Sequence, residues 1–277
     1  MGGAIWLASY PKSGNTWARL ALLSLSNGGA PASLGELGGF APMLATNPNL
    51  DRLLQVESGH LTEDEIEALR PDLNRELFAG PEPRPCKVHD AWTRAPDGRP
   101  LFDADVTHAA IYLVRDPRDI AVSWSRFAGV GIDRAVAMLA DPGAELSSNA
   151  RAARLQLRQR LKSWSRHVTS WLDESGFDPL LIRYEDMLED PAREIARMAA
   201  HMGWAAEPQA VAGAVEATRF EELAEQERRH GFRERMDRTE RFFHTGRSGG
   251  WRELLSADQA ARIERDHGEV MARLGYR

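Results

Sequence analysis

The sequence predicts an α/β fold, a single domain spanning residues 1–277 with a central parallel sheet flanked by helices. Short apolar runs that are typical of buried strands alternate with longer helix-forming stretches, which is the pattern of a parallel sheet wrapped by helices. The chain has 277 residues, of which 43% are hydrophobic, so it is long enough to bury one large core. No repeat or long linker divides it.

The expected elements follow one another along the chain. An apolar run predicts a strand at 4–9, and the residues after the next turn predict a helix at 16–26. The other expected elements are strands near 86–89, 109–114 and 179–183, a helix from 117, a long Arg-rich helix around 150–174, and helices after Pro191 and Pro208. In a parallel sheet of this kind, ligands bind beyond the carboxyl ends of the strands.

The first strand and helix are joined by the loop Tyr10-Pro11-Lys12-Ser13-Gly14-Asn15-Thr16-Trp17. A strand–loop–helix connection brings unpaired backbone N–H groups and a helix N-terminus to one point, where a Lys ammonium and two hydroxyls lie beside them. The loop is therefore a candidate site for a phosphate or sulfate group. The Walker A pattern needs an upstream glycine and then Gly-Lys-Ser/Thr, whereas here Lys12 precedes Gly14, so an ordinary NTP-hydrolysing loop is disfavoured.

Residues 10–17 closely resemble the 5′-phosphosulfate loop of the cytosolic-type sulfotransferases, which use 3′-phosphoadenosine 5′-phosphosulfate (PAPS). By itself the loop is equally compatible with a βα turn that carries a solvated lysine. Arg115 and Ser123 match the spacing of the family's 3′-phosphate motif, in which a guanidinium and a hydroxyl hold one phosphate. The alternative for that segment is a helix-capping salt bridge among Arg115, Asp116 and Arg118.

A third segment, residues 242–252, resembles the family's C-terminal glycine motif, although His244 and Thr245 replace the expected Arg-Lys pair. Arg247 could supply the missing charge, and the alternative is a glycine-rich surface loop. Two shorter segments, residues 183–187 and 217–220, also resemble family segments. The resemblance implies that Tyr184, Thr218 and Phe220 contact the nucleoside and that Trp17 stacks on the adenine. The implied cofactor-binding residues are Lys12, Ser13, Gly14, Asn15, Thr16, Trp17, Arg115, Ser123, Tyr184, Thr218, Phe220, Gly246, Arg247, Ser248 and Gly249.

The segment Cys86-Lys87-Val88-His89-Asp90 lies between the first two phosphate motifs. In a strand, residues i and i+2 face the same side, so Lys87 and His89 should point the same way as a cation and a general base. The family carries a Lys-x-His at this place, with the histidine as catalytic base. The resemblance therefore implies catalytic roles for His89, Lys87 and Lys12.

The function that follows is sulfuryl transfer from PAPS to a hydroxyl of a small-molecule acceptor, which leaves adenosine 3′,5′-bisphosphate (PAP) and needs no metal. A P-loop-type small-molecule kinase would need Mg²⁺ ligands, for which Asp116 and Asp119 are available. A non-catalytic nucleotide-binding regulatory module is opposed by the intact Lys12 and His89. Residues 28–85 and 125–150 match no motif and are expected to hold acceptor-binding loops.

The composition of the chain excludes some classes of binding partner and some kinds of structure. The net charge of −6 and pI near 5.8 give no support to nucleic-acid binding. The single cysteine excludes an internal disulfide framework.

Lys12 and Arg19 interrupt the apolar N-terminal run, and no basic region precedes it. Neither a signal peptide nor a membrane span therefore fits, and we expect a cytoplasmic protein. The heavily charged residues 221–249, with few apolar anchors, are a candidate lid, and the alternative is a permanently ordered surface helix with solvated charges.

Overall fold

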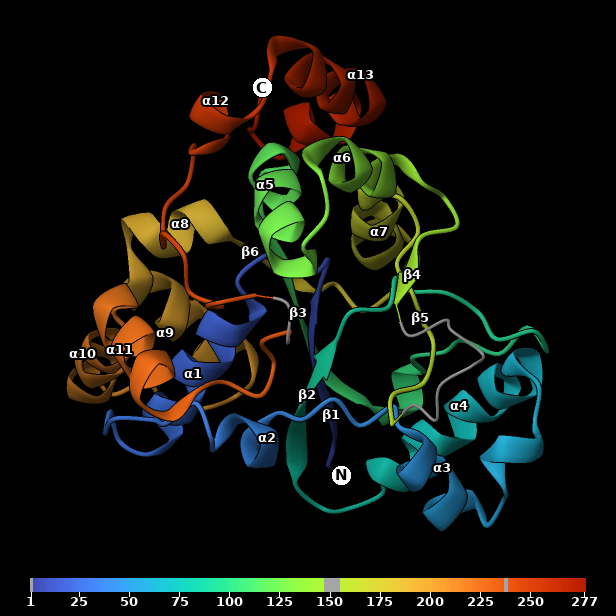
Figure 1. Ribbon diagram of the computed structural model, residues 1–277. Coiled ribbons are helices and arrows are strands. Elements are labelled where there is room, and N and C mark those ends of the chain that lie inside the picture. Colours follow the sequence, from blue (N-terminus) through green and yellow to red (C-terminus); the bar gives the residue numbers. More distant parts are fainter. Residues whose placement is uncertain (1, 147–154, 237–238) are drawn as a thin grey trace.

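The computed structural model describes residues 2–146, 155–236 and 239–277. Its main sheet has the strand order β2-β1-β3-β6, and every neighbouring pair is parallel, as predicted (Figure 1). The four strands are β1 (Gly3–Ser9), β2 (Pro83–Val88), β3 (Thr107–Val114) and β6 (Leu180–Arg183). A separate antiparallel pair joins β4 (Glu145–Leu146) to β5 (Gln159–Arg160).

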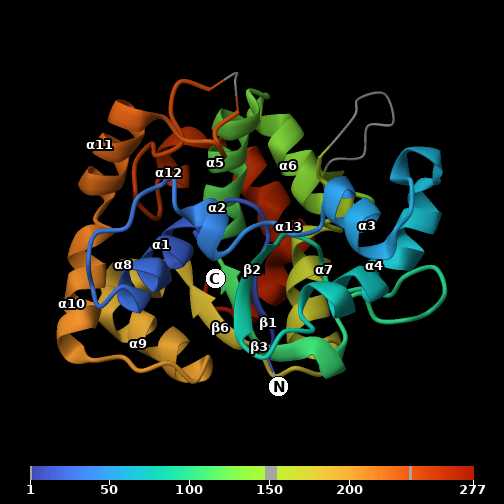
Figure 2. The same cartoon turned by 90° about the horizontal axis from the view of Figure 1, so that it is seen from below.

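Both faces of the sheet are buried around its two central strands, which explains why β1 and most of β3 are apolar. Along β1, Trp6 and Ala8 belong to one core cluster, and Ile5 and Leu7 belong to the other. Figures 1 and 2 show helices on both sides of the sheet. The Ile5 side is covered by α1 (Asn15–Ser26), α9 (Pro191–His201) and α10 (Pro208–Ala217), and the Trp6 side by α4 (Glu63–Leu77), α5 (Pro117–Ala128), α6 (Ile132–Ala140), α7 (Trp164–Thr169) and α13 (Ala257–Arg273).

The predicted helices at 16–26, from 117, and after Pro191 and Pro208 are confirmed. Helices α5, α9 and α10 each begin at a proline, where the missing N–H would have no partner inside the helix. The remaining described helices are α2 (Leu37–Phe40), α3 (Asn47–Leu54), α8 (Tyr184–Glu189), α11 (Phe220–His230), α12 (Trp251–Leu254), the 3₁₀ turns Ser58–His60 and Ala104–Val106, and a π-helical turn at Ser170–Glu174.

The long helix predicted around 150–174 is wrong. Residues 150–154 lie outside the described residues, and residues 155–163 contain β5 instead of helix. Arg158 and Arg160 form ion pairs with Glu67 of α4, so a tertiary contact outweighs the helix propensity of this stretch. The helix begins only at Trp164, after the Ser163 side chain accepts a hydrogen bond from a backbone N–H of the first turn.

Residues 28–85 and 125–150 contain helices that the sequence analysis did not predict. Helix α4 starts with a capping box in which Thr62 and Glu65 each bind the other's backbone N–H. Pro71 lies inside this helix, which conceals the helical pattern in the sequence.

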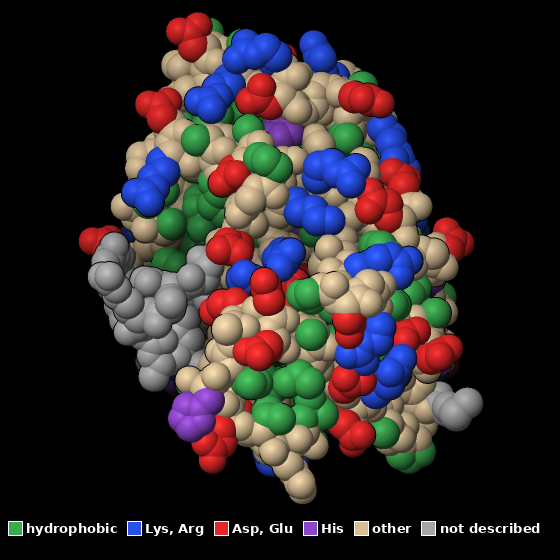
Figure 3. Space-filling model, turned by 90° about the vertical axis from the view of Figure 1, so that its right-hand side faces the viewer, with side chains coloured by type: hydrophobic (Ala, Val, Ile, Leu, Met, Phe, Trp, Pro, Cys, Tyr) green, Lys and Arg blue, Asp and Glu red, His purple; other side chains and the backbone are tan. Residues whose placement is uncertain are grey.

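The face in Figure 3, on the side of α3 and α4, has positive and negative side chains interspersed. Among the described residues, no helix is both long and apolar enough to cross a lipid bilayer.

Candidate active site

The loop between β1 and α1 turns through two residues with positive φ, Lys12 at 72° and Gly14 at 95°. A Cβ atom at Gly14 would lie 2.7 Å from Cδ2 of Tyr184, so both the backbone angle and the space require glycine here. Asn15 Nδ2 donates hydrogen bonds to Leu7 O (2.9 Å) and Ser9 Oγ (3.2 Å), which ties the start of α1 to the end of β1. The loop thereby presents the N-terminus of α1 at the carboxyl edge of the sheet.

Four buried side-chain polar atoms around this loop have no hydrogen-bond partner among the described residues, namely Tyr10 OH, Ser13 Oγ, Asn15 Oδ1 and Arg115 Nε. Buried polar groups are almost always paired, so the donors among them on Ser13 and Arg115 are suited to an oxyanion ligand. Arg115 also donates to Lys12 O (3.3 Å) and to Arg247 O (2.9 Å), and its guanidinium carbon lies 4.2 Å from the ring centre of Tyr184. The binding of PAPS phosphates by these residues stays a prediction.

The helix-capping salt bridge is present between two of the three residues named for it, Asp116 and Arg118. Asp116 forms an ion pair with Arg118 (2.8 Å) and accepts from its backbone N–H. The guanidinium of Arg115 lies outside that pair and donates to Lys12 O of the loop, and its contact with the 3′-phosphate stays a prediction. Ser123 lies half-buried on α5, and its role stays a prediction.

The residues predicted to contact the nucleoside come together beside the loop. Trp17 Nε1 donates to Thr218 Oγ1 (3.3 Å), and the rings of Trp17 and Tyr184 meet edge to face at 5.8 Å. Phe220 packs directly on Gly246, where a Cβ atom would clash with the phenyl ring. Segments separated by about 200 residues therefore form one surface.

The C-terminal glycine motif is held against α5 by one carboxylate. Asp119 Oδ2 accepts from Gly249 N (2.6 Å) and Ser248 Oγ (3.4 Å), and Oδ1 accepts from Trp251 N (3.0 Å). The motif is thus an anchored turn. The Arg247 side chain is exposed, so its proposed contact with the 3′-phosphate remains a prediction.

His89 follows the last residue of β2, and its ring is oriented by the end of β1. Its Nδ1 lies 2.9 Å from Ser9 O and 3.2 Å from Ser9 Oγ. A carbonyl oxygen only accepts, so in the neutral ring Nδ1 carries the proton and Nε2 keeps its lone pair. Burial, reinforced by the positive charge of Lys87, holds the pKa of His89 well below its usual value. The imidazole is therefore neutral at pH 7, as a general base must be.

The two lysines of the site are both sequestered. Lys12 Nζ lies 3.9 Å from the ring centre of Phe242 and 4.1 Å from that of Phe127. Burial, with smaller contributions from Arg115 and Lys87, lowers the pKa of Lys12 to about 7. Lys87 Nζ binds Glu234 Oε2 at 2.9 Å.

Sequence reasoning missed Glu234, Arg19 and Phe242. The sequence held a signal for one of them, because Arg19 interrupts an otherwise apolar helix. In the structure Arg19 is only 1% exposed, so its charge needs a buried partner. That partner is Glu234, at 2.7 Å. The expectation of few apolar anchors in 221–249 is also wrong, since Phe232, Phe242 and Phe243 pack together.

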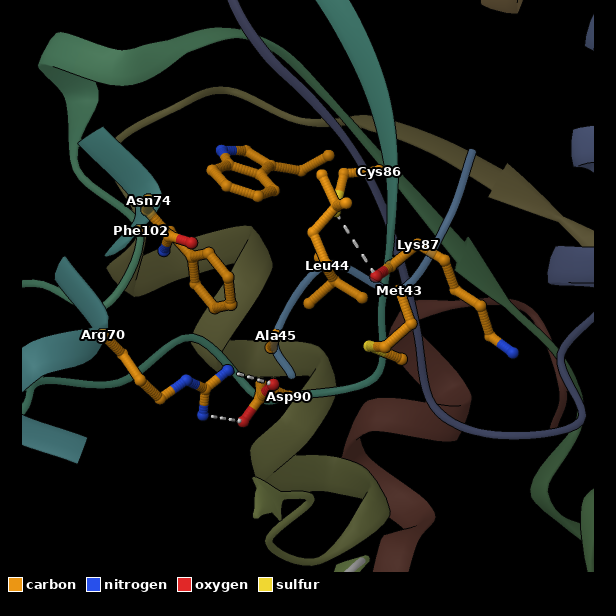
Figure 4. A pocket seen from close by; sticks show the side chains of 11 residues that line it. Met43, Leu44, Ala45, Arg70, Asn74, Cys86, Lys87, Asp90 and Phe102 are labelled. Atoms are coloured by element: carbon orange, nitrogen blue, oxygen red, sulfur yellow. Dashed lines mark hydrogen bonds and ion pairs between the residues drawn. The ribbon is translucent and has the colours of Figure 1, made fainter. Parts of the chain in front are cut away.

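A small cavity lies on the face of β2 opposite to the Lys87 ammonium group. Figure 4 shows that the Lys87 side chain points away from it, and that the ion pair between Arg70 and Asp90 (2.8 Å) closes one end. Its lining residues are Trp6, Met43, Leu44, Ala45, Arg70, Asn74, Cys86, Lys87, Val88, Asp90 and Phe102. Because it is separated from the Lys87 ammonium by the strand, the cavity is not part of the anion site.

The chain is similar to known proteins over most of its length. A family model described as sulfotransferase domain matches residues 3–275. Sulfotransferase 1A1 of Rattus norvegicus is 26% identical over 273 residues, which cover 96% of this chain and 83% of that protein. Cytosolic sulfotransferase 12 of Arabidopsis thaliana is 27% identical, covering 94% of this chain and 75% of that protein.

The fold is shared with retinol dehydratase, solved in complex with androsterone and the inactive cofactor PAP. That structure superposes with a TM-score of 0.63 at 20% identity and covers 97% of this chain and 80% of the other. With the domain match extending over nearly its whole length, the chain belongs to the sulfotransferase domain family.

Proposed function

We propose that this sulfotransferase moves the sulfuryl group of PAPS to a hydroxyl of a small-molecule acceptor, with His89 as general base. The observation that carries the proposal is the orientation of His89, whose Nδ1 binds Ser9 O at 2.9 Å and leaves Nε2 as a free base next to the phosphosulfate loop. A positioned base of this kind contributes about 10²–10⁴-fold to rate.

Each residue then has a definite task. PAPS supplies an activated sulfuryl group on its phosphosulfate. Ser13, the backbone N–H groups of the loop and Arg115 bind the phosphates. His89 Nε2 accepts the proton of the attacking hydroxyl, and the ammonium groups of Lys87 and Lys12 stabilise the negative charge that develops on the sulfuryl and the departing phosphate.

The acceptor class is inferred from chemistry. A neutral imidazole suits a hydroxyl nucleophile, whose proton must be removed during attack. A second solved structure of this fold, with a TM-score of 0.62, is described as a complex of retinol dehydratase with retinol and PAP. We take small organic alcohols as the first acceptors to test. We also propose a cytoplasmic location, in keeping with the name of the Arabidopsis relative.

The kinase alternative is less well supported. Asp119, which it would need for Mg²⁺, accepts hydrogen bonds from Gly249 and Trp251, and Asp116 is paired with Arg118. Both carboxylates already have structural roles. A regulatory module without catalysis gives no reason for the orientation of His89.

The test is incubation of the purified protein with PAPS and a panel of phenols, aliphatic alcohols, sterols and sugars. PAP release and the sulfated product are measured together. We expect acceptor-dependent PAP release that Lys12→Ala abolishes. Absence of PAP release with every acceptor, or phosphate transfer from ATP to the same panel, would overturn the proposal.

A further inference from the structure

The carboxylate of Glu234 connects three parts of the site. It lies in the irregular segment after α11, between Gly231 and the described end of that segment at Met236. Its Oε2 accepts from Lys87 Nζ at 2.9 Å and from Thr16 Oγ1 at 3.4 Å. The same carboxylate receives Arg19 NH2, at 2.7 Å on one oxygen and 2.8 Å on the other.

This geometry restrains Lys87 in a specific way. An ammonium group has three N–H donors, and one of them is taken by Glu234. With the Nζ atom fixed at that point, the other two donors remain for an oxyanion. A flexible four-carbon side chain loses much of its rotational freedom when its tip is held in this manner.

The Glu234 carboxylate is itself held in place by the Arg19 guanidinium. Arg19 is 1% exposed and also donates to Ala41 O at 3.2 Å, so its guanidinium is a rigid support. The Glu234 side chain is 28% exposed, and Phe232 nearby is anchored in an apolar cluster with Leu20 and Leu23. The carboxylate is therefore part of the folded framework.

We propose that Glu234 is a positioning residue for sulfuryl transfer, which holds the Lys87 ammonium charged and directed toward the donor site. The inference rests on the proposed function, since it assigns Lys87 to the transferring group. Glu234 acts through Lys87 and needs no contact with substrate.

The charges around Lys87 predict the sign of a pH effect. Burial and the guanidinium of Arg19 lower the pKa of Lys87, whereas Glu234 raises it. His89 and Lys12 also face this group of charges. Removing the carboxylate should thus lower the pKa of Lys87 further, so the charged form is lost at lower pH.

The first experiment compares Glu234→Gln with wild type. We expect kcat to fall roughly 10- to 100-fold, as for misplacement of a catalytic group. The alkaline limb of the kcat profile should move down by about one to three pH units, the usual effect of one close opposite charge. The dissociation constant of PAPS should change less than kcat.

Controls separate positioning from folding. Glu240→Gln makes the same substitution on an exposed side chain of the same segment and should leave kcat and the pH profile unchanged. Glu234→Asp should restore part of the activity. If Glu234→Gln misfolds because Arg19 is left unpaired, the double variant Arg19→Met/Glu234→Gln removes both charges. It should show a smaller shift in the same direction, because the loss of Arg19 raises the pKa of Lys87 and offsets part of the loss of Glu234.

A second readout does not depend on activity. The rate at which an amine-reactive reagent labels Lys87 is followed by peptide mass spectrometry at pH 8, and it should rise in Glu234→Gln because more of the amine is neutral. If wild type transfers no sulfuryl group, the proposed function fails while the labelling still tests the role of Glu234.

Two results would overturn the positioning role. A lower melting temperature with unchanged labelling and an unchanged alkaline limb would make Glu234 merely structural. Tighter PAPS binding with undiminished kcat in Glu234→Gln would show instead that the carboxylate competes with the donor for Lys87.

Discussion

Binding of PAP should draw a proton from solvent onto Lys12. In the free protein the ammonium is enclosed by Phe127 and Phe242, and burial lowers its pKa to about 7. The phosphates of the nucleotide favour the charged form, so the pKa rises when PAP binds. Binding above the free pKa must therefore be coupled to proton uptake.

The size of the uptake follows from the free pKa. With a pKa of about 7, the fraction of Lys12 that is neutral is about 0.1 at pH 6 and about 0.8 at pH 7.5. If the bound lysine is fully charged, those fractions are the protons taken up per PAP. Uptake should thus be about 0.1 proton at pH 6 and about 0.8 proton at pH 7.5.

Isothermal titration calorimetry measures this number directly, from the dependence of the binding enthalpy on the ionisation enthalpy of the buffer. The titrations are made in HEPES and in Tris, since phosphate would compete for the site. Lys12→Met is the matched control, because its apolar side chain still fits between the two phenyl rings. Protons exchanged by PAP itself or by other residues cancel in the difference between the two proteins.

Equal buffer dependence in wild type and Lys12→Met at pH 7.5 would refute the reasoning. It would mean that Lys12 is already charged in the free protein. The result does not depend on the acceptor, so it can be obtained before the acceptor is known.

Three further expectations concern the other parts of the site. His89→Ala should lower kcat about 10²- to 10⁴-fold with PAP affinity nearly unchanged, and normal turnover at neutral pH would remove His89 as the base. Arg115→Ala should weaken PAP binding far more than His244→Ala, and equal binding of adenosine 5′-phosphosulfate and PAPS would show that the 3′-phosphate grip is unused. Amide hydrogen exchange in 221–249 should slow when PAP binds, and more than in 257–273, which lie away from the site; identical exchange with and without PAP would leave the lid without support.

Local patterns in the sequence determined much of the fold and the outline of the site. Apolar strands alternating with helices predicted the parallel sheet, because each β–loop–α unit is encoded by neighbouring residues. The loop around Lys12 and the strand-end Arg115 were recognisable for the same reason. The i, i+2 spacing of Lys87 and His89 predicted that their side chains point the same way.

Contacts between distant segments could be decided only by the tertiary structure. Glu234 reaches Lys87 across 147 positions, and nothing in its local sequence distinguishes it from its charged neighbours. The tautomer of His89 that leaves Nε2 unprotonated depends on its contact with Ser9 O, a backbone atom whose position a sequence pattern does not reveal. The helix prediction for residues 155–163 was wrong for the same reason, because Arg158 and Arg160 form ion pairs with Glu67 of a helix that is distant in the sequence. Propensity and spacing act over a few residues, whereas buried charges are paired by whatever the fold brings within reach.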